Sequence, residues 1–167
     1  MLNQLFNKLV KGKRDIRIRK AVNADVFELI SLIKDIRKAY GLPIDLKKKD
    51  QDLLSIDFYY KNGNFLVAED DGRIVGCAAI FYSKDGSASI TKFYVDRFYR
   101  KLGLGTELVN MLCAYAEEAD QHQIHINIPH RMRAAQKFMR KIGFEKINAK
   151  IANSNSSFEK FIKDLRH

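Results

Sequence analysis

The sequence is poor in cysteine and contains no long apolar run. Its 167 residues include only Cys77 and Cys113, which are too few for a disulfide scaffold, and their apolar neighbours predict buried thiols in a reducing compartment. No apolar stretch approaches the ~20 residues that a transmembrane helix requires. The first fourteen residues do not predict a signal peptide, because polar side chains interrupt their apolar run and no small-residue cleavage site follows. We therefore expect a cytoplasmic protein.

Several motifs that bind common ligands are also absent. The P-loop pattern does not occur, and Leu108 stands where a dinucleotide-binding Gly-x-Gly-x-x-Gly motif has its third glycine. The spacing of His122, His125 and His130 matches no standard metal site, so we expect no metal. No recognition helix, zinc site or aromatic RNA-binding motif accompanies the basic residues. Nothing therefore indicates firmly that the partner is nucleic acid.

The charge is positive and unevenly distributed. The net charge is +10, and residues 1–20 carry seven basic and one acidic side chain, while residues 129–167 carry ten basic and three acidic ones. The middle of the chain is slightly acidic. A basic end can bind nucleic acid or an anionic membrane surface, but solvated surface is the default interpretation of most of these charges.

Length and composition indicate one domain. A chain of this length with 46% hydrophobic residues can form one compact core, and we place that domain at residues 15–167, after a basic extension at residues 1–14. A helix in the extension can pack on its own domain, on a second subunit or on a membrane, and we favour intramolecular packing or a homodimer contact. The helix is predicted by apolar residues at helical spacing: Leu2, Leu5, Phe6, Leu9 and Val10.

Hydrophobic periodicity and turn residues predict strands alternating with helices. The first helix begins with Asn23 as its N-cap, and Asp70-Asp71-Gly72 forms a hairpin turn. The expected strands are 17–20, 65–69, 74–83, 87–95, 124–128 and one on each side of a turn at 153–156; the expected helices are 23–40, 50–60, one from Leu104 onward and 132–141.

The most informative segment joins the strand at 87–95 to the helix that begins near Leu104. Gly103 and Gly105 fall at the N-terminus of this helix, where the first amides lack partners in the helix and can bind an anion. Glycines there let an oxygen-rich ligand approach the backbone. Arg100 and Lys101 add positive charge, so the segment predicts a phosphate-binding site.

Three segments of the sequence resemble the GNAT superfamily of N-acetyltransferases. Residues 93–96 followed by Arg-x-x-Gly-x-Gly at 100–105 resemble its acetyl-CoA signature, residues 135–145 resemble its late helix and the exit from it, and residues 65–76 resemble the hairpin that opens its sheet. The resemblance covers roughly residues 16–165. It implies an α+β fold of α/β/α layers, with a mixed, mostly antiparallel sheet of about six to seven strands and helices on both faces.

The resemblance implies transfer of an acetyl group from acetyl-CoA to a primary amine by direct attack in a ternary complex. It assigns the pyrophosphate to amides of residues 102–106, the pantetheine arm to the strand before them, and the thioester oxygen to an amide at or near Val95. Part of the late basic cluster faces the phosphates. The expected cofactor-binding residues are Phe93, Tyr94, Val95, Arg100, Lys101, Leu102, Gly103, Leu104, Gly105, Thr106 and Lys137.

The sequence departs from the family at the residues that move protons. Ser89 stands where many members have a glutamate base, Met139 stands where a tyrosine acid is common, and Met132 replaces an asparagine that often contacts the cofactor. We name His130 and Tyr94 as catalytic candidates in their place, since the ordinary pKa of histidine suits proton transfer near neutral pH. Glu69 is a further candidate that would act through water.

The acceptor is left open by the sequence. Acidic residues in the region where relatives build the acceptor side can receive a cationic amine, but they equally suit helix caps and solvated loops. The acceptor is either a small molecule, such as a polyamine, amino acid or aminoglycoside, or a protein amine. A non-catalytic acyl-CoA-binding or regulatory module is the alternative function, and a basic nucleic-acid-binding domain is a third. The acidic residues are Asp45, Asp50, Asp52 and Asp57.

Overall fold

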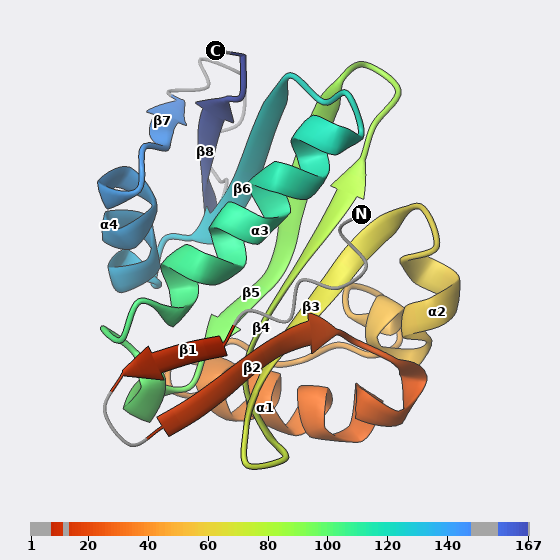
Figure 1. The fold of residues 1–167 in the computed structure, drawn as a ribbon, viewed down its shortest axis with the longest axis vertical. Coiled ribbons are helices and arrows are strands. Elements are labelled where there is room, and N and C mark those ends of the chain that lie inside the picture. The colour runs from red at the N-terminus through yellow and green to blue at the C-terminus, as the bar shows by residue number, and fades with distance from the viewer. Residues whose placement is uncertain (1–7, 12–13, 148–156, 167) are drawn as a thin grey trace.

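The computed structural model describes residues 8–11, 14–147 and 157–166. Over these residues the chain forms one eight-stranded sheet with helices packed against it (Figure 1). The strands are β1 (Lys8–Lys11), β2 (Arg14–Lys20), β3 (Gly63–Asp70), β4 (Arg73–Tyr82), β5 (Ser87–Val95), β6 (Gln123–Pro129), β7 (Glu145–Ile147) and β8 (Phe158–Asp164). The helices are α1 (Val26–Lys38), α2 (Ile56–Tyr59), α3 (Leu104–Glu118) and α4 (Arg133–Lys141), and short 3-10 turns occupy Asn23–Asp25, Gln51–Leu54 and Arg97–Tyr99.

The sheet is mixed and mostly antiparallel, as expected. Its strand order is β1-β2-β3-β4-β5-β6-β8-β7, and among these pairs β5–β6 is parallel. The described residues form one strand more than expected because Lys8–Lys11 pairs with β2, with Leu9 opposite Ile16. The helix predicted over residues 1–14 is therefore wrong at 8–11, where pairing with the edge of β2 overrides local periodicity. Residues 1–7 lie outside the described residues, and the division at residue 14 stays a prediction.

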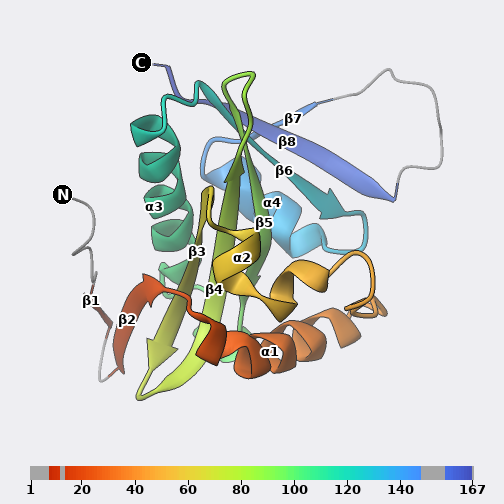
Figure 2. The ribbon, with the colours of Figure 1, turned by 90° about the vertical axis from the view of Figure 1, so that its right-hand side faces the viewer.

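Two apolar cores, one on each face of the sheet, hold the helices. α3 and α4 pack on one face through side chains such as Leu108, Leu112 and Met139, while α1 and α2 pack on the other through Leu29, Ile33 and their neighbours. Figure 2 shows α3 on one side of the sheet and α1 and α2 on the other. The expected α/β/α layering is confirmed. Within the described ranges, no helix combines the length and apolar character needed to cross a bilayer.

β5 and β6 separate after a short parallel contact. Their register runs from Ser87 opposite Gln123 to Ile90 opposite Ile126 and stops there, and Figure 2 shows β6 turning away from β5. The remainder of β5 pairs with β4 through an irregular register, in which two residues of β5 oppose one of β4. Such a bulge bends a strand and redirects its side chains. Residues 91–95 therefore have a described strand partner on the β4 side alone.

Several predicted boundaries shift because local contacts differ from those expected. Asn23 does not cap α1: its side chain accepts a hydrogen bond from the Asp57 amide instead, and α1 begins at Val26 after a 3-10 turn. The helix expected at 50–60 is split at Ser55, which has an extended backbone. The hairpin at Asp71 and Gly72 is confirmed, and both residues have positive φ. The turn expected at 153–156 lies outside the described residues.

A cluster of charged side chains connects β2 to the start of α1. The Arg19 guanidinium donates to both oxygens of Asp25 at 2.7 and 2.8 Å and also contacts Glu69 on β3. Asp25 in addition accepts from the Val22 amide at 2.8 Å. The Arg19 hydrogen bonds, together with that amide, hold the pKa of Asp25 below its ordinary value. The ionised carboxylate is therefore part of the folded structure.

Asp25→Asn should make folding less stable near neutral pH and have a smaller effect in acid. The ionised Asp25 contributes stability above the ordinary carboxyl pKa, and this contribution disappears as the pH falls through the lowered value in the folded state. We expect a loss of about 1–3 kcal/mol at pH 7, typical of hydrogen bonds to a charged group, narrowing toward zero below about pH 3. Urea unfolding across this pH range measures it.

The control for this experiment is Asp35→Asn, which changes an exposed carboxylate on the same helix. It should leave the unfolding midpoint nearly unchanged at every pH. A destabilisation by Asp25→Asn that is equally large at pH 3 and pH 7 would show that the charge of Asp25 is not what stabilises the fold.

Candidate functional site

The start of α3 forms the predicted anion site, which comprises residues 100–106. Gly103 is the N-cap residue and has φ 85°, a left-handed conformation that a glycine adopts without strain. The first backbone hydrogen bond of the helix runs from the Glu107 amide to the Gly103 carbonyl at 3.0 Å. The amides of residues 104–106 precede it and lie at the positive end of a 15-residue helix. This is the geometry that binds phosphate groups.

Gly105 also has a packing role, besides its expected place in the anion site, which stays a prediction. A Cβ built on Gly105 would lie 3.3 Å from the rings of both Phe93 and Phe138, which stack on each other with centroids 5.5 Å apart. The absence of a side chain therefore lets α3 approach β5 and α4 closely. The sequence showed a glycine at a helix start but not the two rings beside it.

The cations of the anion site differ in their placement. Arg100 turns back toward the strand: its Nε donates to the Val95 carbonyl at 3.0 Å, and its side chain lines a cavity of about 410 Å³ beside α1. Lys101 is exposed and has φ 61°, a conformation that is uncommon for residues other than glycine. The predicted contribution of both charges to the anion site stays a prediction.

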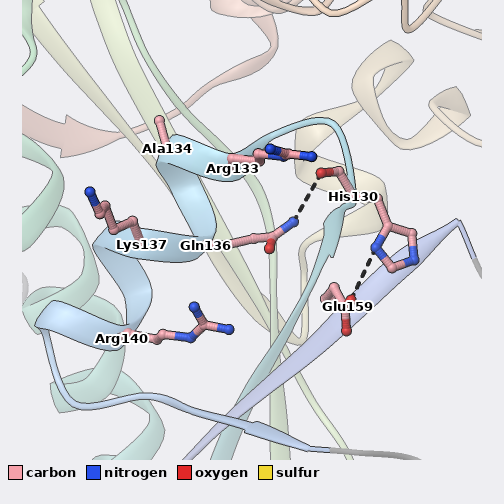
Figure 3. A pocket seen from close by; sticks show the side chains of 7 residues that line it. All are labelled: His130, Arg133, Ala134, Gln136, Lys137, Arg140 and Glu159. Carbon is pink, nitrogen blue, oxygen red and sulfur yellow. Dashed lines mark hydrogen bonds and ion pairs between the residues drawn. The ribbon is translucent and has the colours of Figure 1, made fainter.

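An open groove of about 700 Å³ lies between α4 and β8 (Figure 3). His130, which follows β6, lies at its edge with Nδ1 3.0 Å from Glu159 Oε1. Glu159 also pairs with Lys146 at 2.9 Å, and the Gln136 amide group donates to the carbonyls of Pro129 and His130. The side chain of His130 is half exposed. The groove is lined by His130, Arg133, Ala134, Gln136, Lys137, Arg140 and Glu159.

The remaining predicted residues are distributed over both faces of β5. Phe93 packs on the α3 side against Phe138, the residue that follows Lys137 in the sequence. Tyr94 contacts both cores, and burial raises the pKa of its hydroxyl to about 12, although the Arg37 charge acts in the opposite direction. The thiol of Cys77 donates to the Lys92 carbonyl, and burial raises its pKa to about 12. Both cysteines are buried and free, as predicted.

The structure also places the residues that stand where family members have their proton-transfer and cofactor-contact residues. Met139 is fully buried in the α3 side core and Met132 is 9% exposed. Ser89 stands opposite His125 on β6 and Phe81 on β4, inside the paired part of β5. Glu69, a further proton-transfer candidate, is bound by Arg19 between β2 and β3. It therefore lies two strands from β5 in the sheet order, and its role as a base in the cleft is not supported by this position.

A buried polar cluster was not predicted from the sequence. Lys92 on β5 places Nζ 2.9 Å from Asp50 Oδ1 and 3.2 Å from Asp52 Oδ1, and Arg37 on α1 also binds Asp50 at 2.9 Å. Burial alone would raise the pKa of Asp50, but the Asp45 amide, Lys92 and Arg37 hold it below its ordinary value. Asp50 and Asp52 are therefore already paired with cations of the chain, which corrects the expectation that they receive a cationic amine. The available signal was a lysine inside a strand whose other residues are uncharged.

Within residues 8–11, 14–147 and 157–166, no group of three or more histidine, cysteine, aspartate or glutamate side chains is arranged to hold a metal ion. The predicted absence of a metal stays a prediction.

Two curated relatives match part of the chain. The chain is 31% identical over 83 residues to "Probable N-acetyltransferase 14" of Danio rerio, covering 49% of this chain and 30% of that protein. It is 29% identical over 120 residues to "Probable N-acetyltransferase camello" of Xenopus tropicalis, covering 69% of this chain and 54% of that protein. The chain thus spans about half, or less, of the length of these relatives.

Solved structures match nearly the whole fold. An acetyltransferase of the GNAT family from Staphylococcus aureus Mu50 superposes with a TM-score of 0.80 and 25% identity, covering 90% of this chain and 99% of that one. A Salmonella typhimurium protein solved with its cofactor acetyl-CoA superposes with a TM-score of 0.67 and 19% identity, covering 90% and 94%, and shows the fold alone. The family model described as "Acetyltransferase (GNAT) family" matches residues 29–144. Because this match covers more than half of the chain, the chain belongs to the acetyltransferase (GNAT) family.

Proposed function

We propose that the protein is an N-acetyltransferase that moves the acetyl group of acetyl-CoA to a primary amine. The observation that carries the proposal is that α3 begins shortly after the part of β5 that has separated from β6, and Gly105 in its first turn lies beside the ring of Phe93 on β5. Phosphate-binding amides and strand edge groups thus lie next to each other. The acetyl-CoA bound to the Salmonella typhimurium protein of the same fold supports the choice of donor, and the names of both curated relatives support the choice of reaction.

The residues of the chain fit an acyl-CoA thioester. The first amides of α3 suit its pyrophosphate, with Arg100 and Lys101 adding charge, and the backbone of residues 93–95 suits its amide-containing arm because this edge of β5 lacks a described strand partner. The proposed contact residues are those named from the sequence: Phe93, Tyr94, Val95, Arg100, Lys101, Leu102, Gly103, Leu104, Gly105, Thr106 and Lys137.

When bound, acetyl-CoA supplies the activated acetyl group, and the chain supplies position and proton transfer. Transfer forms a carbon–nitrogen bond to the amine and breaks the carbon–sulfur bond, so a proton leaves the nitrogen and one reaches the sulfur. An amide at or near Val95 would stabilise charge on the carbonyl oxygen. We assign proton transfer to His130, because it follows β6, the strand that separates from β5, and its ring is half exposed. Tyr94 is the second candidate.

A non-catalytic acyl-CoA-binding module is the second candidate function. It is favoured by Met139, which is fully buried at the position where relatives carry a tyrosine acid, and by the pKa of Tyr94, which is raised to about 12. A side chain that keeps its proton so firmly is a poor proton donor near neutral pH.

Two measurements on the same protein separate these functions. Acetyl-CoA should raise the melting temperature in either case, and release of free thiol in the presence of amines should occur only for the enzyme. The amines are an amino acid, a polyamine, an aminoglycoside and a peptide with a free N-terminus and a lysine. Stabilisation without thiol release would support the module, and no stabilisation would contradict both and favour a nucleic-acid-binding domain.

Gly103→Val should weaken acetyl-CoA binding about tenfold or more. A β-branched residue strains the left-handed conformation at φ 85° and crowds the amides of the anion site. The matched control is Gly72→Val, which imposes similar strain at φ 78° in the β3–β4 turn, where an added Cβ meets nothing within 4 Å. Both variants should lose stability, but calorimetric titration should show a weaker Kd in Gly103→Val alone. Equal affinity in the two variants would remove the anion site from the proposal.

His130→Ala should lower kcat by about a hundredfold or more, which is the usual contribution of a general base or acid, and should leave the Kd for acetyl-CoA within about twofold. Steady-state thiol release and calorimetry measure the two quantities. The control is His122→Ala, an exposed histidine just before β6, at the opposite end of that strand. Unchanged kcat in His130→Ala would shift the proton-transfer role to Tyr94 or solvent.

A further inference from the structure

Lys92 joins two parts of the molecule that border the proposed site. It lies on β5 two residues beyond the last pair with β6, in the bulge opposite Ala78, and its φ is 52°. From this bulge its side chain reaches the segment between α1 and α2, where it contacts Asp50 and Asp52. A lysine in the left-handed region is uncommon, and such residues persist where the surrounding structure holds them.

The charges around Lys92 balance. Two cations, Lys92 and Arg37, face two carboxylates, Asp50 and Asp52, and the side chains of Lys92 and Asp50 are 8% and 3% exposed. Asp52 also accepts a hydrogen bond from the Tyr60 hydroxyl. Removing the lysine charge would leave two carboxylates with one cation in a place that water hardly reaches. Breaking a buried pair on one side in this way is strongly unfavourable.

Three separate parts of the chain contact the Asp50 carboxylate. Arg37 comes from the last turn of α1, Lys92 comes from β5, and the Asp45 amide comes from the connection between α1 and the 3-10 turn Gln51–Leu54. Residues 42–50 of that connection contain no helix or strand. Its position against β5 therefore depends on this carboxylate and on the two cations that hold it.

We propose that Lys92 is a positioning residue: by pairing with Asp50 and Asp52 it fixes residues 45–54 against the strand that carries the proposed acetyl-CoA contacts. The segment lies on the α1 and α2 face of β5, opposite the face on which Phe93 and α3 meet. On the proposed function, Phe93 and α3 hold acetyl-CoA on the opposite face, so we assign the amine to this one. Loss of the lysine charge then weakens productive binding of the amine and leaves the acetyl-CoA contacts intact.

Hydrogen–deuterium exchange of the full chain tests the placement of this segment. In Lys92→Met, exchange of amides in residues 45–54 should rise about tenfold or more, while exchange in α3 and β6 stays as in the wild type. Lys92→Arg, which keeps the charge, should recover most of the protection. Lys49→Met is the matched control, because it removes an exposed lysine from the same segment, and it should change nothing.

Lys92→Met with Asp52→Asn provides a second variant in case the single change prevents folding. It removes one charge of each sign, so it should protect residues 45–54 better than Lys92→Met does. The Kd for acetyl-CoA should stay within about twofold in every folded variant, and the KM of the amine found by thiol release should rise in Lys92→Met with a smaller change in kcat.

Unchanged exchange at residues 45–54 in Lys92→Met, or a rise spread evenly over the domain, would overturn the proposal. A Kd for acetyl-CoA weakened as much as the amine KM would also overturn it, since Lys92 would then act on the cofactor strand. The exchange experiment needs no ligand. If the wild-type protein fails to bind acetyl-CoA, the proposed function alone is contradicted, and the exchange result still decides the role of Lys92.

Discussion

The separation of β5 from β6 after Ile90 is the constraint on which the proposed site depends. A parallel pair that continued to Val95 would use the edge groups of β5 for its own hydrogen bonds and leave no backbone for a ligand. The bulge at Lys92 bends β5 at the point where the pairing stops. The chain then passes through the 3-10 turn Arg97–Tyr99 into α3, whose residue Gly105 lies beside Phe93 on β5. The interruption of the sheet therefore leaves part of β5 unpaired close to the start of α3.

Different contacts hold the two sides of this separated strand. On the α3 side the contact is apolar: Phe93 and Phe138 stack, and Gly105 leaves room for both rings. On the α1 side it is ionic, through Lys92 and Asp50. Apolar packing tolerates small shifts of its members, whereas a buried pair that loses one partner leaves a charge unsolvated. The position of the α1–α2 connection is therefore the more sensitive of the two to a single substitution.

Local patterns predicted most of the strands and helices, because hydrophobic period and turn residues report on neighbouring residues, and the resemblance to the GNAT superfamily implied the layers. These patterns did not predict features that depend on residues far apart in the sequence. Lys8–Lys11 is a strand because the edge of β2 is available to it, and Gly105 is needed because of a ring on another helix. The Lys92 cluster joins residues up to 55 positions apart, from Arg37 to Lys92. The sequence left Asp50 and Asp52 open between acceptor binding and helix caps or solvated loops, because the cations that pair with them lie far along the chain.

The burial that builds the cleft also limits which groups can move protons in it. Tyr94 and Cys77 lie nearest the separated part of β5, and burial raises the pKa of each to about 12, far from the near-neutral value that suits an acid or base. Asp50 and Asp52 are paired with Lys92, and Met139 carries no proton to give. On the proposed function, β5 thus supplies position and backbone dipoles, and the proposed proton-transfer residue is His130, which follows β6 and is half exposed beside Glu159.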